Sequence, residues 1–205
     1  MPTRFNHQNQ RFRPSSKEDH VVEKAKEHFE RTLISIRGEL AGSVAALEHP
    51  NQDDALNYGE IFLRDNVPVM IYLLLQGRYA IVRQFLSVCL DLQSTTVQTR
   101  GVFPTSFVEE NDELVADYGQ RSIGRITSVD ASLWWPILCW IYVKRSGDSD
   151  FGRSPRVQRG LQLLLDLVLH PSFEGTPVLF VPDCAFMIDR PCLLYTSPSP
   201  RDLST

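Results

Sequence analysis

Two apolar helical stretches joined by one short turn constrain the fold of this 205-residue chain more than any other feature. Residues 57–76 become apolar on nearly every side over 70–75, and residues 79–92 carry apolar side chains at the three- and four-residue steps of one helix face. Gln76-Gly77-Arg78 separates the two stretches, and glycine is favoured directly after the end of a helix. Helices joined by so short a turn must fold back on each other, so the sequence predicts a helical hairpin.

The rest of the chain favours the all-α fold class. Apolar periodicity predicts further helices over residues 15–34, 130–143 and 155–170, and almost no segment alternates like a strand. Residues 95–128 lose the periodicity and contain several glycines, which predicts one long loop. Long ordered loops in compact domains are often functional.

Composition and charge exclude several classes of function. The chain is 42% hydrophobic and 22% charged with a formal net charge of −4, and no stripe of lysine or arginine follows any element. We therefore expect no nucleic-acid binding. No apolar run reaches the ~20 residues that cross a membrane, and no signal peptide opens the chain. We expect a cytoplasmic protein without membrane contact.

The four cysteines do not form a metal-binding pattern. They lie far apart without a CxxC pair, and no histidine stands at ligand spacing, so we expect neither a metal nor another cofactor. Cys89 and Cys139 fall inside apolar helical stretches, where a reduced thiol behaves as a small buried apolar side chain.

Both ends of the chain differ in composition from its centre. Residues 1–14 are polar, and we expect them to be disordered. Residues 192–205 are rich in serine and proline, have no apolar pattern, and look like translated adaptor sequence, which predicts a non-native tail. The predicted folded domain is therefore 15–191.

An acidic residue stands just ahead of two adjacent tryptophans, at a predicted helix start. One interpretation is that Asp130 caps the helix and core aromatic residues follow it. The other is a sugar site, because flat indole faces suit sugar rings and a carboxyl group can protonate a glycosidic oxygen. Trp134 lies one helical turn after Asp130 and can cover its carboxyl, whereas Trp135 points elsewhere and is expected to pack in the core.

Arg64-Asp65 is a second candidate site, at the entrance of a predicted helix. A guanidinium only donates and a carboxylate only accepts, so the pair can hold neighbouring sugar hydroxyls in complementary directions. The alternative is a local salt bridge, which is common and contributes little. We favour the sugar clamp because the pair stands among Tyr58, Phe62 and Pro68 rather than on a charged face.

Several sequence blocks follow one another in the order found in a known family. Together they resemble the alkaline/neutral invertase family of glycoside hydrolases, from about residue 45 to residue 190, and no single block is as specific as the ordered set. The blocks are AAL at 45–47, LNYGEIFLRDNVP at 56–68, IVRQFL at 81–86, GVFPTSF at 101–107, ADYGQRSIGRITSVD at 116–130, LWW at 133–135 and FMIDR at 186–190.

The resemblance implies an (α/α)6 barrel, a ring of six helical hairpins with the active site in loops at one end. It also implies sucrose as substrate, hydrolysed with inversion to glucose and fructose. Inverting glycosidases place two carboxyl groups roughly 6.5–9.5 Å apart across the bond. The family's second carboxylate belongs to a segment that this sequence lacks. We therefore expect an N-terminal fragment, a partial barrel and no activity of the chain alone, and self-association of the full-length protein stays open.

The resemblance also implies roles for single residues. Asp130 matches the family's general acid, which must hold a proton near neutral pH and so needs an apolar wall or a like-charged neighbour. Arg64 and Asp65 match a sugar-binding pair of related glycosidases. From the residues themselves, the other substrate-binding candidates are Asn57, Tyr58, Arg125 and Trp134. Three residues of the long loop suit sugar binding, holding the acid in place, or hydrogen bonding within the loop: Asp117, Gln120 and Arg125.

Two other functions stay open at the level of sequence. The first is a helical-hairpin interaction module without catalysis, although no repeat of 33–45 residues is present. The second is a related (α/α)6 glycosidase that acts on another glucoside, because loops from both halves of the barrel set sugar specificity.

Overall fold

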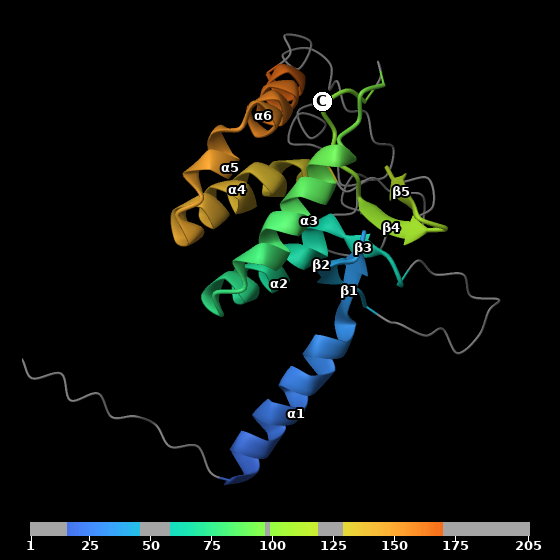
Figure 1. The fold of residues 1–205 in the computed structure, drawn as a ribbon. Helices are drawn as coiled ribbons and strands as arrows, with labels where there is room; N and C mark the ends of the chain where they lie inside the picture. The colour runs from blue at the N-terminus through green and yellow to red at the C-terminus, as the bar shows by residue number, and fades with distance from the viewer. Residues whose placement is uncertain (1–15, 46–57, 97–98, 119–128, 170–205) are drawn as a thin grey trace, which may run out of the picture. The chain divides into compact units, whose positions relative to one another are not determined.

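The computed structural model of the chain describes residues 16–45, 58–96, 99–118 and 129–169 (Figure 1). Within these ranges the chain divides into two units, one that ends at Thr32 and one that begins at Leu33, and each is described by itself. The predicted boundaries at 15 and 191 stay predictions. The predicted segments and candidates that lie outside the described residues are 1–14, 192–205, Asn57, Gln120 and Arg125.

Helix α1, Ser16–Thr32, makes up the first unit. Glu18 and Asp19 lie in its first turn and Arg31 lies in its last, an arrangement that suits the partial charges at the two ends of a helix. The predicted helix is confirmed here, but it ends two residues before its predicted end at residue 34.

The second unit opens with an antiparallel hairpin of β1 (Leu33–Ile36) and β2 (Glu39–Ser43). From the sequence, Gly38 and Gly42 are interpreted as residues that end or bend the first helix beyond its apolar face at 15–34, and the structure corrects this. Gly38 has a φ of 78° and forms the tight turn, since glycine adopts the left-handed region without strain. At Gly42 a Cβ atom would lie 2.7 Å from Cγ2 of Ile61, so only glycine lets β2 approach so closely.

A second small sheet replaces much of the predicted long loop. Strands β3 (Ile61–Phe62), β4 (Ser106–Glu110) and β5 (Glu113–Asp117) pair antiparallel in that order. Asn111 and Asp112 connect β4 to β5 with φ of 53° and 65°, which is the geometry of a two-residue hairpin turn. The prediction of a loop without strands is therefore wrong in this stretch.

Helices α2 (Leu63–Leu75) and α3 (Tyr79–Asp91) form the predicted hairpin. Gly77 stands at the turn with a φ of 75°, as expected for a residue that ends a helix. Helix α2 begins six residues after the predicted start at 57, because β3 occupies the residues immediately before it.

Helix α4 (Val129–Ser146) is followed by the short α5 (Ser149–Arg153) and by α6 (Pro155–Val168). The Ser154 side chain accepts a hydrogen bond from Val157 N–H at the start of α6, as expected for a serine directly before a proline at a helix start. Both helices predicted in this part of the chain are confirmed, and α5 is additional.

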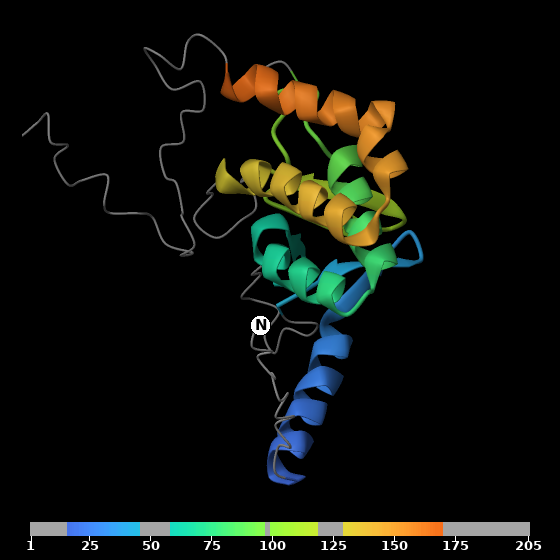
Figure 2. The same cartoon turned by 90° about the vertical axis from the view of Figure 1, so that its left-hand side faces the viewer.

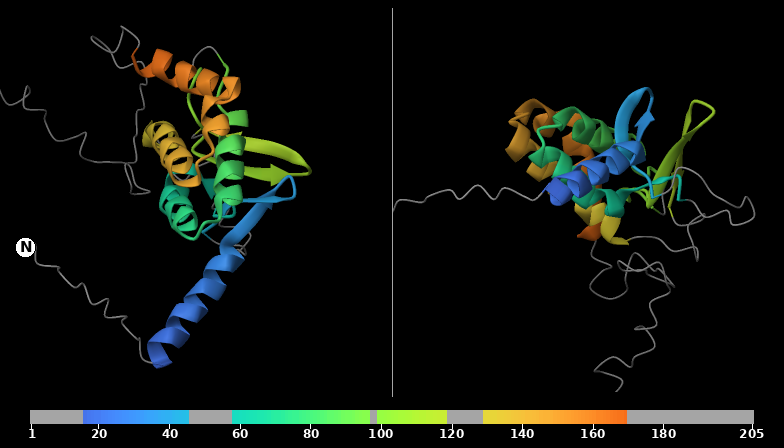
Figure 3. Two further views of the ribbon diagram at one scale, coloured as in Figure 1. Left: turned by 60° about the vertical axis from the view of Figure 1, so that its left-hand side comes forward. Right: turned by 90° about the horizontal axis from the view of Figure 1, so that it is seen from below.

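The helices of the second unit pack in pairs. Helices α2 and α4 lie side by side, α3 contacts both, and β2 packs against α3 (Figures 2 and 3). Within the described residues the fold is thus mostly helical with two small antiparallel sheets, rather than all-α. The described helices do not close a ring, so the barrel stays a prediction. Within the same ranges, no helix is both long and apolar enough to span a bilayer.

Trp135 is the largest side chain that is fully buried. Its ring stacks on Phe103 with 4.7 Å between centroids, and its Nε1 donates to Leu86 O over 3.1 Å. The indole therefore connects α4 to α3 and to the segment that precedes β4. The prediction that Trp135 packs in the core is confirmed.

One face of α4 leaves large apolar side chains exposed. Leu133, Ile137 and Trp140 follow one another at three- and four-residue steps and are 48%, 46% and 63% exposed. A contiguous exposed apolar stripe of this kind favours association with other surfaces.

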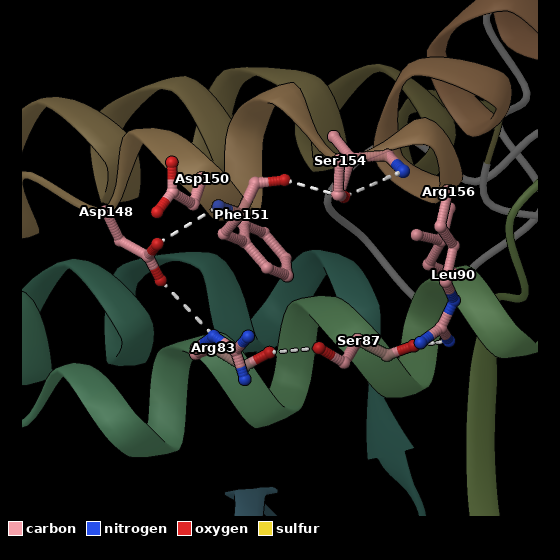
Figure 4. A pocket seen from close by; sticks show the side chains of 9 residues that line it. Arg83, Ser87, Leu90, Asp148, Asp150, Phe151, Ser154 and Arg156 are labelled. Atoms are coloured by element: carbon pink, nitrogen blue, oxygen red, sulfur yellow. Dashed lines mark hydrogen bonds and ion pairs between the residues drawn. The ribbon is translucent and has the colours of Figure 1, made fainter.

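A pocket of about 340 Å³ lies between α3 and the turn from α5 to α6 (Figure 4). Charged side chains border it, and two ion pairs connect α3 to the helical segments on the other side. Arg83 Nε lies 3.2 Å from Asp148 Oδ2, and Arg156 pairs with Asp91 of α3. These two ion pairs are formed within the protein. They connect the helices on either side of the pocket, and the paired side chains do not offer a charged site to a ligand.

Asp148 is the centre of this arrangement. Tyr142 Oη donates to its Oδ2 over 2.8 Å, Phe151 N donates to its Oδ1 over 3.0 Å, and both bonds favour the ionised carboxylate. These hydrogen bonds, together with the charge of Arg83, lower the pKa of Asp148. Burial, followed by the hydrogen bond and charge of Asp148, raises the pKa of Tyr142 to about 12.

The Asp148 cluster predicts a stability that depends on pH. Because the pKa of Asp148 is lower in the folded chain, its contribution is present at neutral pH and is lost as the pH falls below about 4. We expect Asp148→Asn to reduce the free energy of unfolding by roughly 1–2 kcal/mol at pH 7 and by less at pH 3. Urea unfolding at both pH values measures the difference. Asp150→Asn, in the same pocket wall, is the matched control, and an Asp148→Asn effect of equal size at both pH values would contradict the prediction.

Candidate functional site

The starts of helices α2 and α4 bring together two predicted site residues that stand 66 positions apart in the sequence. Arg64 Nη1 lies 3.5 Å from Asp130 Oδ1, and the two side chains are 11% and 28% exposed. Each residue is the second of its helix, so the side-by-side packing of α2 and α4 places both at the same end. The structure thus joins the two candidate segments of the sequence.

Asp65 adds a second carboxylate to this cluster. Its Oδ1 lies 3.5 Å from Arg64 Nε, and the side chain is 61% exposed. The local salt bridge considered for this pair is present, but the same guanidinium also reaches Asp130, which a purely local pair would not do. One donor group therefore stands between two acceptor groups, which is a suitable arrangement for polar hydroxyl ligands.

The neighbour of Asp130 differs from the expected one. A general acid was expected to face an apolar wall or a like charge, whereas the structure places a cation beside the carboxyl group. Trp134 is half-buried one turn further along α4, and its covering of the carboxyl stays a prediction.

Asn66 positions the start of α2, and the sequence analysis missed it. The side chain is buried, and its Oδ1 accepts from Ser43 N over 2.7 Å while its Nδ2 donates to Ser43 O and Phe62 O, both over 2.9 Å. One amide group thus ties α2 to β2 and β3, directly after Arg64 and Asp65. The sequence offers only a weak sign of this role, namely that an asparagine inside a helix often forms hydrogen bonds to nearby backbone groups instead of solvent.

The remaining described candidates lie in or near the two small sheets. Tyr58 is half-buried, and its carbonyl accepts from Ala45 N over 3.1 Å. Asp117 is buried at the end of β5, where its carbonyl accepts from Thr105 N over 2.8 Å. This bond does not involve the Asp117 carboxyl group, so both roles considered for that side chain stay predictions.

A pocket of about 180 Å³ lies at the start of α2, beside the end of β2. Asp65 and the buried Glu60 both line it, and Glu60 Oε2 accepts from Ser106 Oγ over 2.6 Å. Typical small-molecule pockets measure about 300–1,000 Å³, so this one is large enough for only part of a disaccharide. Glu60 is a second pocket carboxyl that sequence reasoning did not single out.

The described cysteines are buried. Burial raises the pKa of Cys139 to about 11 and that of Cys89 well above its ordinary value, so both are neutral thiols at physiological pH. Their predicted behaviour as small apolar core side chains is confirmed. In the part of the chain that the structure covers, no three or more metal-binding side chains gather at one place.

Comparison with known proteins identifies the family. The sequence pattern of the family described as alkaline and neutral invertase matches residues 25–200. Alkaline/neutral invertase CINV2 of Arabidopsis thaliana is 36% identical over 190 residues, which cover 87% of this chain and 34% of the relative. Cytosolic invertase 1 of Oryza sativa subsp. japonica is 36% identical over the same length, with coverage of 87% and 34%.

A third relative, neutral/alkaline invertase 3, chloroplastic, of Oryza sativa subsp. japonica, is 37% identical over 198 residues, covering 88% of this chain and 32% of the relative. The names of these relatives point to different compartments, so the cytoplasmic location stays a prediction. The chain spans about a third of the length of the curated relatives it matches. Since the family pattern matches well over half of its residues, the chain belongs to the alkaline and neutral invertase family.

Proposed function

We propose that this chain contributes part of the active site of a sucrose-hydrolysing glycoside hydrolase. In this proposal Asp130 is the general acid, and Arg64 and Asp65 bind sugar hydroxyls, with Tyr58 and Trp134 at the edge of the site. Asn57 and Arg125 complete the proposed set of sugar-binding residues. The observation that carries the proposal is the 3.5 Å contact between Arg64 and Asp130, two residues from separate sequence blocks that both lie within the range matched by the family pattern.

The proposed reaction follows from the chemistry of two carboxyl groups. The Asp130 carboxyl gives its proton to the glycosidic oxygen as the bond from that oxygen to the anomeric carbon breaks. A water molecule attacks the anomeric carbon from the opposite face and loses its proton to a second carboxylate, which inverts the configuration. We propose that this second carboxylate comes from a part of the enzyme that this sequence does not contain.

The arrangement of the helices supports a partial (α/α)6 barrel as the setting of this site. Hairpin α2–α3 and the α4–α6 segment lie next to each other, and α2 and α4 bring their first turns to one end. We propose that they are neighbouring units of the ring, with the cluster of Arg64, Asp65 and Asp130 at its active-site end. We propose sucrose as the substrate, no cofactor and a cytoplasmic location.

The proposal predicts that the 205-residue chain alone does not hydrolyse sucrose. Asp130 cannot both protonate the leaving oxygen and activate water on the opposite face of the sugar, and the carboxylate proposed for the second task is not in this sequence. Release of glucose from sucrose by the purified chain is the measurement. Turnover that disappears in an Asp130→Asn variant would contradict this expectation.

The site residues are tested in a protein of family length. We suggest a chimera in which the part of this chain that aligns with Arabidopsis invertase CINV2, without residues 192–205, replaces the matching segment of that enzyme. Asp130→Asn is expected to lower kcat by roughly 10²–10⁴-fold, because general acid catalysis contributes about that much. Asp65→Asn is expected to raise KM for sucrose more than it lowers kcat, because it removes an acceptor for sugar hydroxyls.

The control for both variants is Asp166→Asn, whose carboxyl lies on the exposed surface of α6 and accepts from Gln162 Nε2. Full activity of the Asp130→Asn chimera would exclude Asp130 as the general acid. Faster hydrolysis of trehalose or maltose than of sucrose would keep the glycosidase and change its substrate.

A further inference from the structure

The backbone of the segment Phe103–Thr105, here called the bridge segment, forms one hydrogen bond to the first turn of each site helix. We propose that the bridge segment sets the distance between Arg64 and Asp130, and that Ser132 is the positioning residue through which it holds Asp130. The proposal rests on the proposed function, since it explains how the general acid and the sugar clamp are kept in place.

The first attachment is to α2. Leu63 N, the first amide of that helix, donates to Thr105 O over 3.0 Å. The first amides of a helix have no partner inside it, and Phe62 at the N-cap provides no side-chain acceptor. Thr105 O therefore does what a capping side chain does elsewhere, and it acts at the residue directly before Arg64.

The second attachment is to α4. Phe103 N donates to Ser132 Oγ over 3.0 Å, and Ser132 is 5% exposed and stands two residues after Asp130. The Phe103 ring stacks on Trp135 of the next turn, so Phe103 contacts α4 through both its backbone and its side chain. The buried N–H of Phe103 needs this acceptor, because an unpaired buried donor is costly.

The bridge segment is stiff enough to transmit a position. Pro104 fixes its own φ between the two attachments, and residues 101–107 are all buried. Further backbone bonds hold both ends: Thr105 N donates to Asp117 O over 2.8 Å, and Val102 O accepts from Ser94 N over 2.8 Å. The starts of α2 and α4 are therefore attached to Thr105 and Phe103, which are only two residues apart in one rigid segment.

Ion pairing alone does not explain the geometry of the site. The contact between Arg64 and Asp130 is 3.5 Å long, beyond the about 2.7–2.9 Å of a strong charge-assisted hydrogen bond. A contact of this length follows the positions of its two helices rather than setting them. Loss of the Ser132 acceptor is therefore expected to release the first turn of α4 and to weaken the contact.

The experiment measures this contact directly in the 205-residue chain. The ¹³C NMR signal of the Asp130 carboxyl carbon is recorded with and without Arg64→Gln, and the difference reports the contact. We expect Ser132→Ala to reduce that difference by at least half, and Ser132→Thr, which keeps the hydroxyl, to restore it. If the alanine variant does not fold, Ser132→Cys takes its place, because it approximately keeps the side-chain volume and provides only a weak acceptor. It is expected to reduce the Arg64-dependent difference as well.

Ser146→Ala is the matched control, because it removes a serine hydroxyl that donates to Tyr142 O at the other end of α4. It is expected to leave the Arg64-dependent difference unchanged. A Ser132→Ala variant with a lower Tm and an unchanged difference would overturn the proposal and leave Ser132 a purely structural residue. Absence of any Arg64-dependent difference in the parent chain would overturn it as well.

The chimera separates this result from the proposed function. Full activity of the Asp130→Asn chimera, with an NMR difference that still depends on Ser132, would reject the catalytic role of Asp130 and keep the positioning role of the bridge segment. An inactive Asp130→Asn chimera, together with an NMR difference that does not depend on Ser132, would keep the catalytic role and reject the positioning role of the bridge segment.

Discussion

The burial of the Trp135 indole is the interaction on which the rest of the second unit depends. One side chain contacts three separate parts of the chain: its own helix α4, Leu86 of α3 through Nε1, and Phe103 through ring stacking. Removal of so much apolar surface from water stabilises the packing, and the Nε1 hydrogen bond allows only one orientation of the ring. The positions of α3, α4 and the bridge segment are therefore fixed together.

The site uses this packing to hold charge at the edge of the core. Arg64 is largely buried, and a buried guanidinium is tolerated only with partners, which Asp65 and Asp130 provide. Helix N-termini favour carboxylates, and both acids lie in the first turn of a helix. The cluster therefore combines a guanidinium whose burial is unfavourable with two carboxylates at favourable positions. The packing of α2 beside α4 brings Arg64 and Asp130 together.

Elements with a strong local signal could be predicted from the sequence, and elements decided by distant contacts could not. Gly77 between two apolar stretches predicts the α2–α3 hairpin, and the burial of Trp135 follows from helical spacing. The β1–β2 hairpin was missed because Leu33 continues the apolar phase of the preceding helix. The Asn111-Asp112 turn was missed because its flanking strands are short, and the role of Asn66 depends on Ser43, which lies far away in the sequence.

The geometry of the site therefore follows from backbone hydrogen bonds and aromatic packing more than from its charges. The 3.5 Å contact between Arg64 and Asp130 is too long to fix two helices. The hydrogen bonds from Leu63 N to Thr105 O and from Phe103 N to Ser132 Oγ are shorter and buried, and they act one residue before Arg64 and two residues after Asp130. A sugar-binding cluster built in this way can lose or exchange its charged contacts when a ligand binds, because the frame that positions the side chains does not depend on them.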